Sequence, residues 1–228
     1  MIEVTNLIKS YKTKVEDLVV LKGITFSVKK GEFLAITGRS GSGKSTLLYQ
    51  LGLLDYPNSG NIILDGLDVT KLSNNERTKM RLERLGYVFQ DYALLPSLSA
   101  LENVMVPLLM QGMNKINAKR DAKYALERLG LGHREANLPS QLSGGEQQRV
   151  SIARAIAHKP KILFADEPTA NLDSETSNVV LKAFLDLHKD GQTILMVTHE
   201  KEYAELANRE IALSDGVIAE VFHYHKEK

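Results

Sequence analysis

The run Gly38-Arg39-Ser40-Gly41-Ser42-Gly43-Lys44-Ser45 decides the fold that this sequence predicts. Its spacing, G-x-x-x-x-G-K-S, is typical of a loop that wraps the phosphates of a nucleoside triphosphate. The glycines let backbone N–H groups approach a polyphosphate closely because they carry no Cβ. Lys44 supplies a positive charge for the β- and γ-phosphates, and the Ser45 hydroxyl is a ligand that suits Mg²⁺.

The segments on both sides of this run support the same interpretation. Residues 33–37 form a short apolar run, which favours a buried strand, and residues 44–52 have leucines on one side of a predicted helix. The order strand, loop, helix places an anion at a helix N-terminus, where N–H groups and the helix dipole stabilise it. A glycine-rich turn that matches the spacing by chance is the weaker alternative.

Length and composition limit the class of protein. The 228 residues are enough for one large domain or a domain with a sizeable insertion. A balance of 29 Lys and Arg against 28 Asp and Glu argues against a nucleic-acid partner held by overall charge. The absence of cysteine excludes disulfides and suits a reducing cytoplasm. We expect no signal peptide, because residues 1–4 have neither a basic nor an apolar region. We expect no spanning helix, because the most apolar stretch, 104–110, is short and contains Pro107.

The N-terminal part is predicted to be rich in antiparallel strands. Candidate strands cover 2–7, 19–21, 24–28 and 62–64, and Asp65-Gly66 is a hairpin signal. Tyr11 is expected between the first two strands. From its position alone, Tyr11 is equally well explained as an aromatic ring that stacks on a purine or as a half-buried side chain at a strand end.

A helical subdomain is predicted as an insertion into the sheet. A charged helix over 72–85 and a strand over 86–89 lead to Gln90, and the segment from 91 to about 160 is helical in character. Within it, Ser143 followed by Glu146 predicts a capping box at a helix start. Gly144 and Gly145 are unfavourable in the first turn of an ordinary helix, so this start is a candidate for a second phosphate site.

Three polar residues follow buried strands further along the chain. Asp166 and Glu167 come after the apolar strand 162–165, and His199 comes after the strand 193–198. One carboxylate is suited to Mg²⁺ and the other to a water beside the γ-phosphate, with solvated loop acids as the alternative. Asp215-Gly216 predicts a closing hairpin. The histidines His133, His158, His188, His223 and His225 are expected to be solvated.

Together these residues resemble the ATP-binding subunits of ABC transporters, over essentially the whole chain. Residues 38–45 match Walker A, 142–147 the ABC signature, 162–167 Walker B and 171–173 the D-loop. Gln90 matches the Q-loop, His199 the switch histidine and Tyr11 the adenine-stacking aromatic. The amino-acid sequences of residues 51–55, 87–90, 167–173 and 196–200 resemble those of the lipoprotein-releasing and macrolide-efflux branch. Glu146 and Ala170 depart from the Gln and Gly frequent at those positions.

The resemblance implies an α/β P-loop NTPase with the ABC ATPase fold, in which residues 1–228 form one ATP-binding domain. It would contain a RecA-like core, an N-terminal antiparallel β-subdomain and the inserted α-helical subdomain at about 91–160. Catalytic roles fall on Glu167, His199 and Gln90, and Mg²⁺ would be held by Ser45, Gln90 and Asp166. ATP would contact Tyr11, Gly38, Arg39, Ser40, Gly41, Ser42, Gly43, Lys44, Ser45, Thr46, Ser143, Gly144, Gly145 and Glu146.

The resemblance also implies partners. Two copies would form an ATP-dependent homodimer, with each ATP between the phosphate loop of one copy and Ser143-Gly144-Gly145 of the other. An integral membrane permease, with four spanning helices and an extracytoplasmic domain, would use this cycle for lipoprotein release or for efflux of a lipid, peptide or drug. The chain would then lie peripherally on the cytoplasmic face of the plasma or inner membrane.

Two other functions remain open at this stage. A mechanotransmission or signalling module of the division-protein type would transmit force without a cargo. A soluble ABC ATPase of DNA repair or translation is disfavoured because those chains carry two cassettes or a long coiled-coil insertion. The apolar stretch 91–103 is expected to receive a cytoplasmic helix of the permease at Tyr92, Leu94 and Leu95, unless these side chains fill the core of the helical subdomain.

Overall fold

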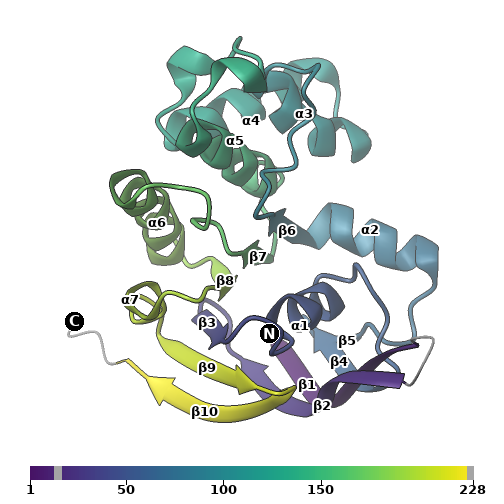
Figure 1. Cartoon of the computed structure of the whole chain (residues 1–228). Coiled ribbons are helices and arrows are strands. Elements are labelled where there is room, and N and C mark those ends of the chain that lie inside the picture. The colour runs from purple at the N-terminus through teal and green to yellow at the C-terminus, as the bar shows by residue number, and fades with distance from the viewer. Residues whose placement is uncertain (13–16, 225–228) are drawn as a thin grey trace. The chain divides into compact units, whose positions relative to one another are not determined.

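A computed structural model describes residues 1–12 and 17–224 of the chain. The chain divides into two compact units, the first made of Met1–Arg81 with Gly191–Lys228 and the second of Leu82–Asp190. Helix α2 (Asn74–Arg84) carries the chain from the first unit to the second (Figure 1). In the described residues, no helix is both long and apolar enough to cross a membrane.

An antiparallel sheet forms much of the first unit, as the N-terminal sequence predicted. Its strand order is β2-β1-β4-β5, with β1 at Ile2–Lys12, β2 at Asp17–Val28, β4 at Ser59–Leu64 and β5 at Leu67–Asp68. The two predicted strands at 19–21 and 24–28 are one strand, because Gly23, with a φ of 88°, lets β2 continue through an irregularity. The placement of Tyr11 between strands was wrong: it lies within β1, paired with Leu18.

A second sheet in this unit carries the glycine-rich loop. Strands β3 (Phe33–Gly38), β8 (Thr193–Val197), β9 (Arg209–Ser214) and β10 (Val217–His223) follow the order β10-β9-β3-β8. Strand β3 is parallel to both of its neighbours, and its buried apolar residues explain why it lies inside the sheet. The loop after β3 leads into α1 (Lys44–Leu51), and the short α7 (Lys201–Ala204) follows β8. The predicted hairpin joins β9 to β10.

The second unit combines two parallel strands with helices. Strands β6 (Leu85–Val88) and β7 (Ile162–Asp166) pair in parallel. Helices α3 (Ala100–Met110), α4 (Lys115–Arg128) and α5 (Gly144–Ile156) pack on one another through buried apolar residues such as Val104, Leu126 and Val150. Short 3₁₀ turns at Gly132–Arg134 and Pro139–Gln141 precede α5, and α6 (Ser174–Lys189) follows β7.

One of the histidines expected to be solvated, His158, has other surroundings. Nε2 of His158 lies 3.0 Å from the backbone oxygen of Leu85, and burial lowers the pKa of this imidazole. His158 follows the end of α5, where the chain lies close to β6. The apolar pattern of the helix does not predict this contact. His223 is the last residue of β10, where it pairs with Arg209, and its side chain is exposed, as expected. His225 lies outside the described residues.

Candidate nucleotide site

Glycines shape the loop between β3 and α1. Gly38 has a φ of 141°, and a Cβ on it would lie 2.3 Å from the backbone oxygen of Leu213. Gly43 has a φ of 101° and caps α1 without any side-chain hydrogen bond. The first N–H groups of α1 therefore point out of the helix without a side-chain cap, which is the arrangement that binds anions.

Lys44 and Ser42 give the loop its chemistry. Lys44 is 6 % exposed, and its Nζ donates hydrogen bonds to the backbone oxygens of Gly38 (2.9 Å) and Arg39 (3.0 Å). The ammonium thus lies across the loop, within the ring of backbone groups. The hydroxyl of Ser42 is buried and has no hydrogen-bond partner among the described residues. Buried hydroxyls are usually satisfied, so a phosphate oxygen is a fitting partner for it.

His199 lies at the same end of the sheet as the loop. Ile36 of β3 pairs with Val197 of β8, and the N–H of Thr198 donates to the backbone oxygen of Ile36 (3.1 Å). Because the two strands are parallel, the residues that follow them emerge at one edge. The side chain of His199 is half exposed, and its Nε2 lies 3.2 Å from Glu200 Oε1. The fold supports the predicted position of His199, while its role remains a prediction.

One edge of the β6–β7 strand pair carries three predicted site residues: Gln90, Asp166 and Glu167. Val88 pairs with Ala165, so Gln90 and Asp166 follow neighbouring parallel strands. Asp166 is 5 % exposed as the last residue of β7. Glu167 has a φ of 43°, a conformation that costs a residue with a Cβ about 1–3 kcal/mol and is concentrated at functional sites. The amide of Asn171 also donates to the backbone oxygen of Gln90 (3.4 Å).

Helix α5 begins with the predicted capping box. Ser143 Oγ accepts a hydrogen bond from the N–H of Glu146 (3.2 Å), and the Glu146 carboxylate accepts one from the N–H of Ser143 (2.8 Å). Arg134 Nε donates to the same carboxylate (2.9 Å). The hydrogen bond from Ser143 and then the Arg134 guanidinium lower the pKa of Glu146. These residues line an open pocket of ≈ 390 Å³ together with Arg149, Glu175, Thr176 and Val179.

The two glycines of the signature have a packing role that the sequence did not show. A Cβ on Gly145 would lie 2.0 Å from Cγ2 of Thr176, and one on Gly144 would lie 3.0 Å from the hydroxyl oxygen of Tyr92. A Cβ at either position would therefore require Thr176 of α6 or Tyr92 of the loop after Gln90 to move, so both residues pack closely on the start of α5. The approach of an anion to bare backbone is thus not the only reason for these glycines.

Two polar residues that the sequence analysis missed hold the loop after Gln90. Arg154, on α5, donates to the backbone oxygens of Tyr92 (2.9 Å) and Ala93 (2.5 Å), which both have positive φ. Asn103, fully buried on α3, bonds to both the N–H and the oxygen of Leu95 (2.7 and 3.1 Å). The available signal was a polar side chain within an otherwise apolar helical pattern.

Tyr11 lies near the end of β1 and is 40 % exposed. Its hydroxyl donates to Asp55 Oδ2 (2.9 Å), and Lys9 Nζ lies 4.7 Å from the centre of its ring. Asp55 follows α1, the helix that begins with Lys44, so Tyr11 is connected to the element that carries the phosphate loop.

Comparison with known proteins identifies the class. The family model described as "ABC transporter" matches residues 21–170, and the chain belongs to this family. It is an ATP-binding protein that hydrolyses ATP, and the α/β fold and the antiparallel β-subdomain predicted from the sequence are confirmed.

Particular relatives narrow the position within the family. The chain is 50 % identical to the lipoprotein-releasing system ATP-binding protein LolD of Aquifex aeolicus, over 93 % of this chain and 96 % of that one. It is 44 % identical to the macrolide export ATP-binding/permease protein MacB of Chlorobaculum tepidum, of which it spans 34 %. A dimeric, post-hydrolysis structure of the ATP-binding cassette MJ0796 with ADP and Pi covers the whole chain with a TM-score of 0.92 at 40 % identity.

Proposed function

We propose that this chain is the ATPase subunit of a membrane transporter that releases lipoproteins or exports a lipid, peptide or drug through a separate permease. The observation that carries the proposal is the 50 % identity to a lipoprotein-releasing ATP-binding protein over 96 % of that relative. The macrolide-export relatives support the efflux alternative. Reconstitution with the permease in liposomes tests the proposal, and ATP turnover without movement of any cargo would favour a signalling module instead.

The site residues receive roles within this proposal. Residues from Gly38 to Thr46 hold the phosphates of ATP, with Lys44 as the positive charge, and Tyr11 stacks on the base. Ser45, Gln90 and Asp166 would hold Mg²⁺, which would supply further positive charge to the phosphates. Glu167 accepts a proton from the attacking water, and His199 positions that water. The chain's own support for these roles is the loop geometry, the buried Ser42 hydroxyl and the position of Asp166 at a strand end.

The active form is proposed to be a homodimer in which the start of α5 binds the ATP of the partner copy. Ser143, Gly144, Gly145 and Glu146 would contact the γ-phosphate from the side opposite to the loop. The pocket at the start of α5 is open, and it is lined by Arg134 and Arg149 together with the carboxylates of Glu146 and Glu175. Solved dimers of a cassette 40 % identical to this chain support this arrangement.

Replacement Ser143→Arg is expected to prevent ATP-driven dimerisation while leaving nucleotide binding by the monomer nearly unchanged. The larger side chain fills the space intended for the partner's phosphate. Light scattering measures dimerisation and calorimetry measures ATP binding in the same sample. A loss of ATP affinity by the monomer would contradict the role of Ser143 in the partner's site.

The matched control is Ser99→Arg, since Ser99 forms the same capping box with Glu102 at the start of α3. Each replacement removes an N-cap worth about 1 kcal/mol, so both variants lose similar stability. Only the Ser143 variant is expected to stay monomeric in ATP.

The permease is proposed to dock at the loop after Gln90, which would make the chain peripheral on the cytoplasmic face of the membrane. Leu95 is 46 % exposed, so this side chain does not fill the core of the helical subdomain. Asn103 fixes the backbone of Leu95, which keeps an apolar side chain on the surface at a defined place. The four spanning helices and the extracytoplasmic domain of the permease belong to the same proposal.

Replacement Leu95→Glu is expected to abolish co-purification with the permease while leaving the ATPase rate and melting temperature of the isolated chain within error. A charge at a docking surface carries a desolvation cost that an exposed side chain avoids in the free protein. Leu109→Glu is the control, because Leu109 is similarly exposed (43 %) on α3. Normal assembly and transport by the Leu95 variant would exclude docking at this loop.

A further inference from the structure

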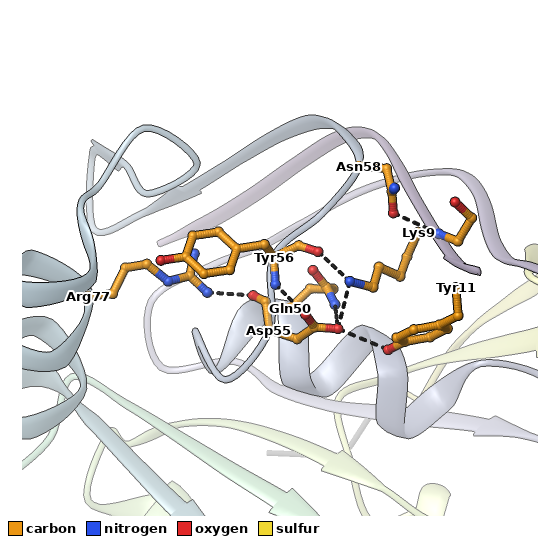
Figure 2. A network of polar contacts seen from close by, with 8 residues as sticks. Lys9, Tyr11, Gln50, Asp55, Tyr56, Asn58 and Arg77 are labelled. Atoms are coloured by element: carbon orange, nitrogen blue, oxygen red, sulfur yellow. Dashed lines mark hydrogen bonds and ion pairs between the residues drawn. The ribbon is translucent and has the colours of Figure 1, made fainter. Parts of the chain in front are cut away.

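One carboxylate collects the polar contacts around Tyr11. Oδ2 of Asp55 accepts hydrogen bonds from the Tyr11 hydroxyl (2.9 Å) and Gln50 Nε2 (3.1 Å), and it forms an ion pair with Lys9 Nζ (2.8 Å) (Figure 2). Its Oδ1 accepts from the N–H of Tyr56 (2.7 Å). Gln50 is fully buried on α1, so Asp55 connects strand β1 to the helix that begins with Lys44.

The backbone around Asp55 is also fixed. Arg77, which is 2 % exposed, donates to the backbone oxygen of Asp55, and its guanidinium lies 3.8 Å from the centre of the Tyr56 ring. Lys9 Nζ donates in addition to the backbone oxygen of Tyr56 (2.7 Å). Buried and stacked partners on both sides leave the Asp55 carboxylate little freedom, so it is a rigid anchor rather than a surface acid.

This anchor determines how the Tyr11 ring is presented. The hydroxyl is tied to Asp55 at one end of the ring, and Lys9 Nζ lies 4.7 Å from the ring centre over one face. A planar base is therefore left with the opposite face for stacking. Burial and the bond to Asp55 raise the pKa of Tyr11, which keeps the phenol neutral. Although burial opposes it, the pKa of Asp55 is lowered by the bonds from Lys9, Tyr56 and Tyr11, so the acceptor stays charged.

We propose that Asp55 is a positioning residue for the nucleotide base: it fixes the Tyr11 ring relative to α1 and so favours a purine nucleotide over a bare polyphosphate. The inference rests on the proposed binding of ATP by Tyr11 and the phosphate loop. Because α1 begins at the phosphate loop and ends four residues before Asp55, one rigid helix sets the separation between the base and the phosphates.

The test is calorimetric titration of the full-length chain with ATP and, separately, with inorganic tripolyphosphate, which has no base. Asp55→Ala is expected to weaken ATP binding about tenfold, within the range of one base-stacking contact, and to leave tripolyphosphate binding unchanged. Asp55→Asn, which keeps an oxygen for the Tyr11 hydroxyl but loses the ion pair with Lys9, is expected to lie between. Asp68→Ala is the control, since Asp68, in β5, is likewise an aspartate paired with a lysine.

A double-mutant cycle separates this inference from the function on which it rests. If Asp55 acts through the ring, Tyr11→Ala combined with Asp55→Ala binds ATP no more weakly than Tyr11→Ala alone. Additive losses, or equal weakening of ATP and tripolyphosphate by Asp55→Ala, would overturn the positioning role. Unchanged ATP binding by Tyr11→Ala would instead refute the stacking of the base on Tyr11, and the inference with it. If Asp55→Ala lowers the melting temperature, the same comparison of ATP and tripolyphosphate binding is made with Asp55→Asn.

Discussion

Lys44→Ala abolishes tight ATP binding, with an expected loss in affinity of about 100-fold or more. A charge-paired group in a desolvated site typically contributes 2–5 kcal/mol, and each 1.4 kcal/mol corresponds to a factor of ten. The side chain is 6 % exposed and lies across the loop, so neighbouring cations on the surface do not replace it. Calorimetric titration with ATP and the steady-state ATPase rate measure the effect.

The control for this variant is Lys71→Ala, because the Lys71 side chain is 85 % exposed. Thermal melting establishes that the Lys44 variant is folded, which matters because Lys44 also donates to two carbonyls of the loop. A folded Lys44→Ala variant with a near-normal rate would mean that the loop after β3 is not the phosphate site.

Glu167→Gln is expected to retain ATP binding and to lose hydrolysis by about 10²–10⁴-fold, the usual worth of a positioned base. Glutamine has the same size as glutamate, so the replacement does not increase the strain of the left-handed backbone conformation at residue 167. Single-turnover hydrolysis measures the chemical step. Because ATP persists, light scattering in ATP is expected to show a stable dimer.

The control is Glu127→Gln, a replacement of the same chemistry on an exposed face of α4. A Glu167→Gln variant that hydrolyses ATP at the normal rate would assign the proton acceptor to another group. A variant that stays monomeric in ATP would instead count against the shared-site dimer.

Local patterns predicted the parts of the site that depend on neighbours in sequence. The apolar run before Gly38, the glycine spacing and the leucines of α1 gave strand, loop and helix in the right order. Ser143 and Glu146 gave the helix start because a capping box spans only four residues. Asp215-Gly216 gave the hairpin for the same reason.

Features that depend on contacts between residues distant in sequence could not be predicted from local patterns. Tyr11 belongs to β1 because the pairing with β2 continues past the apolar residues, up to Leu18 and Asp17. The close contact of Gly145 with Thr176 joins two helices about 30 residues apart in the chain. Asp55 follows α1 without any periodic signal, and its partners Lys9 and Tyr11 are more than 40 residues away. Such side chains are visible only once the tertiary structure is known.

The bonds of Arg154 have a mechanical consequence for the second unit. Arg154 and Ser143 lie about three turns apart on the same helix. Arg154 donates hydrogen bonds to the backbone oxygens of Tyr92 and Ala93. Tyr92 returns to the start of that helix, where its hydroxyl lies close to Gly144. The loop therefore bonds to Arg154 near the end of α5 and lies against Gly144 at its start. We therefore expect a displacement of this loop to be transmitted along α5 to Ser143.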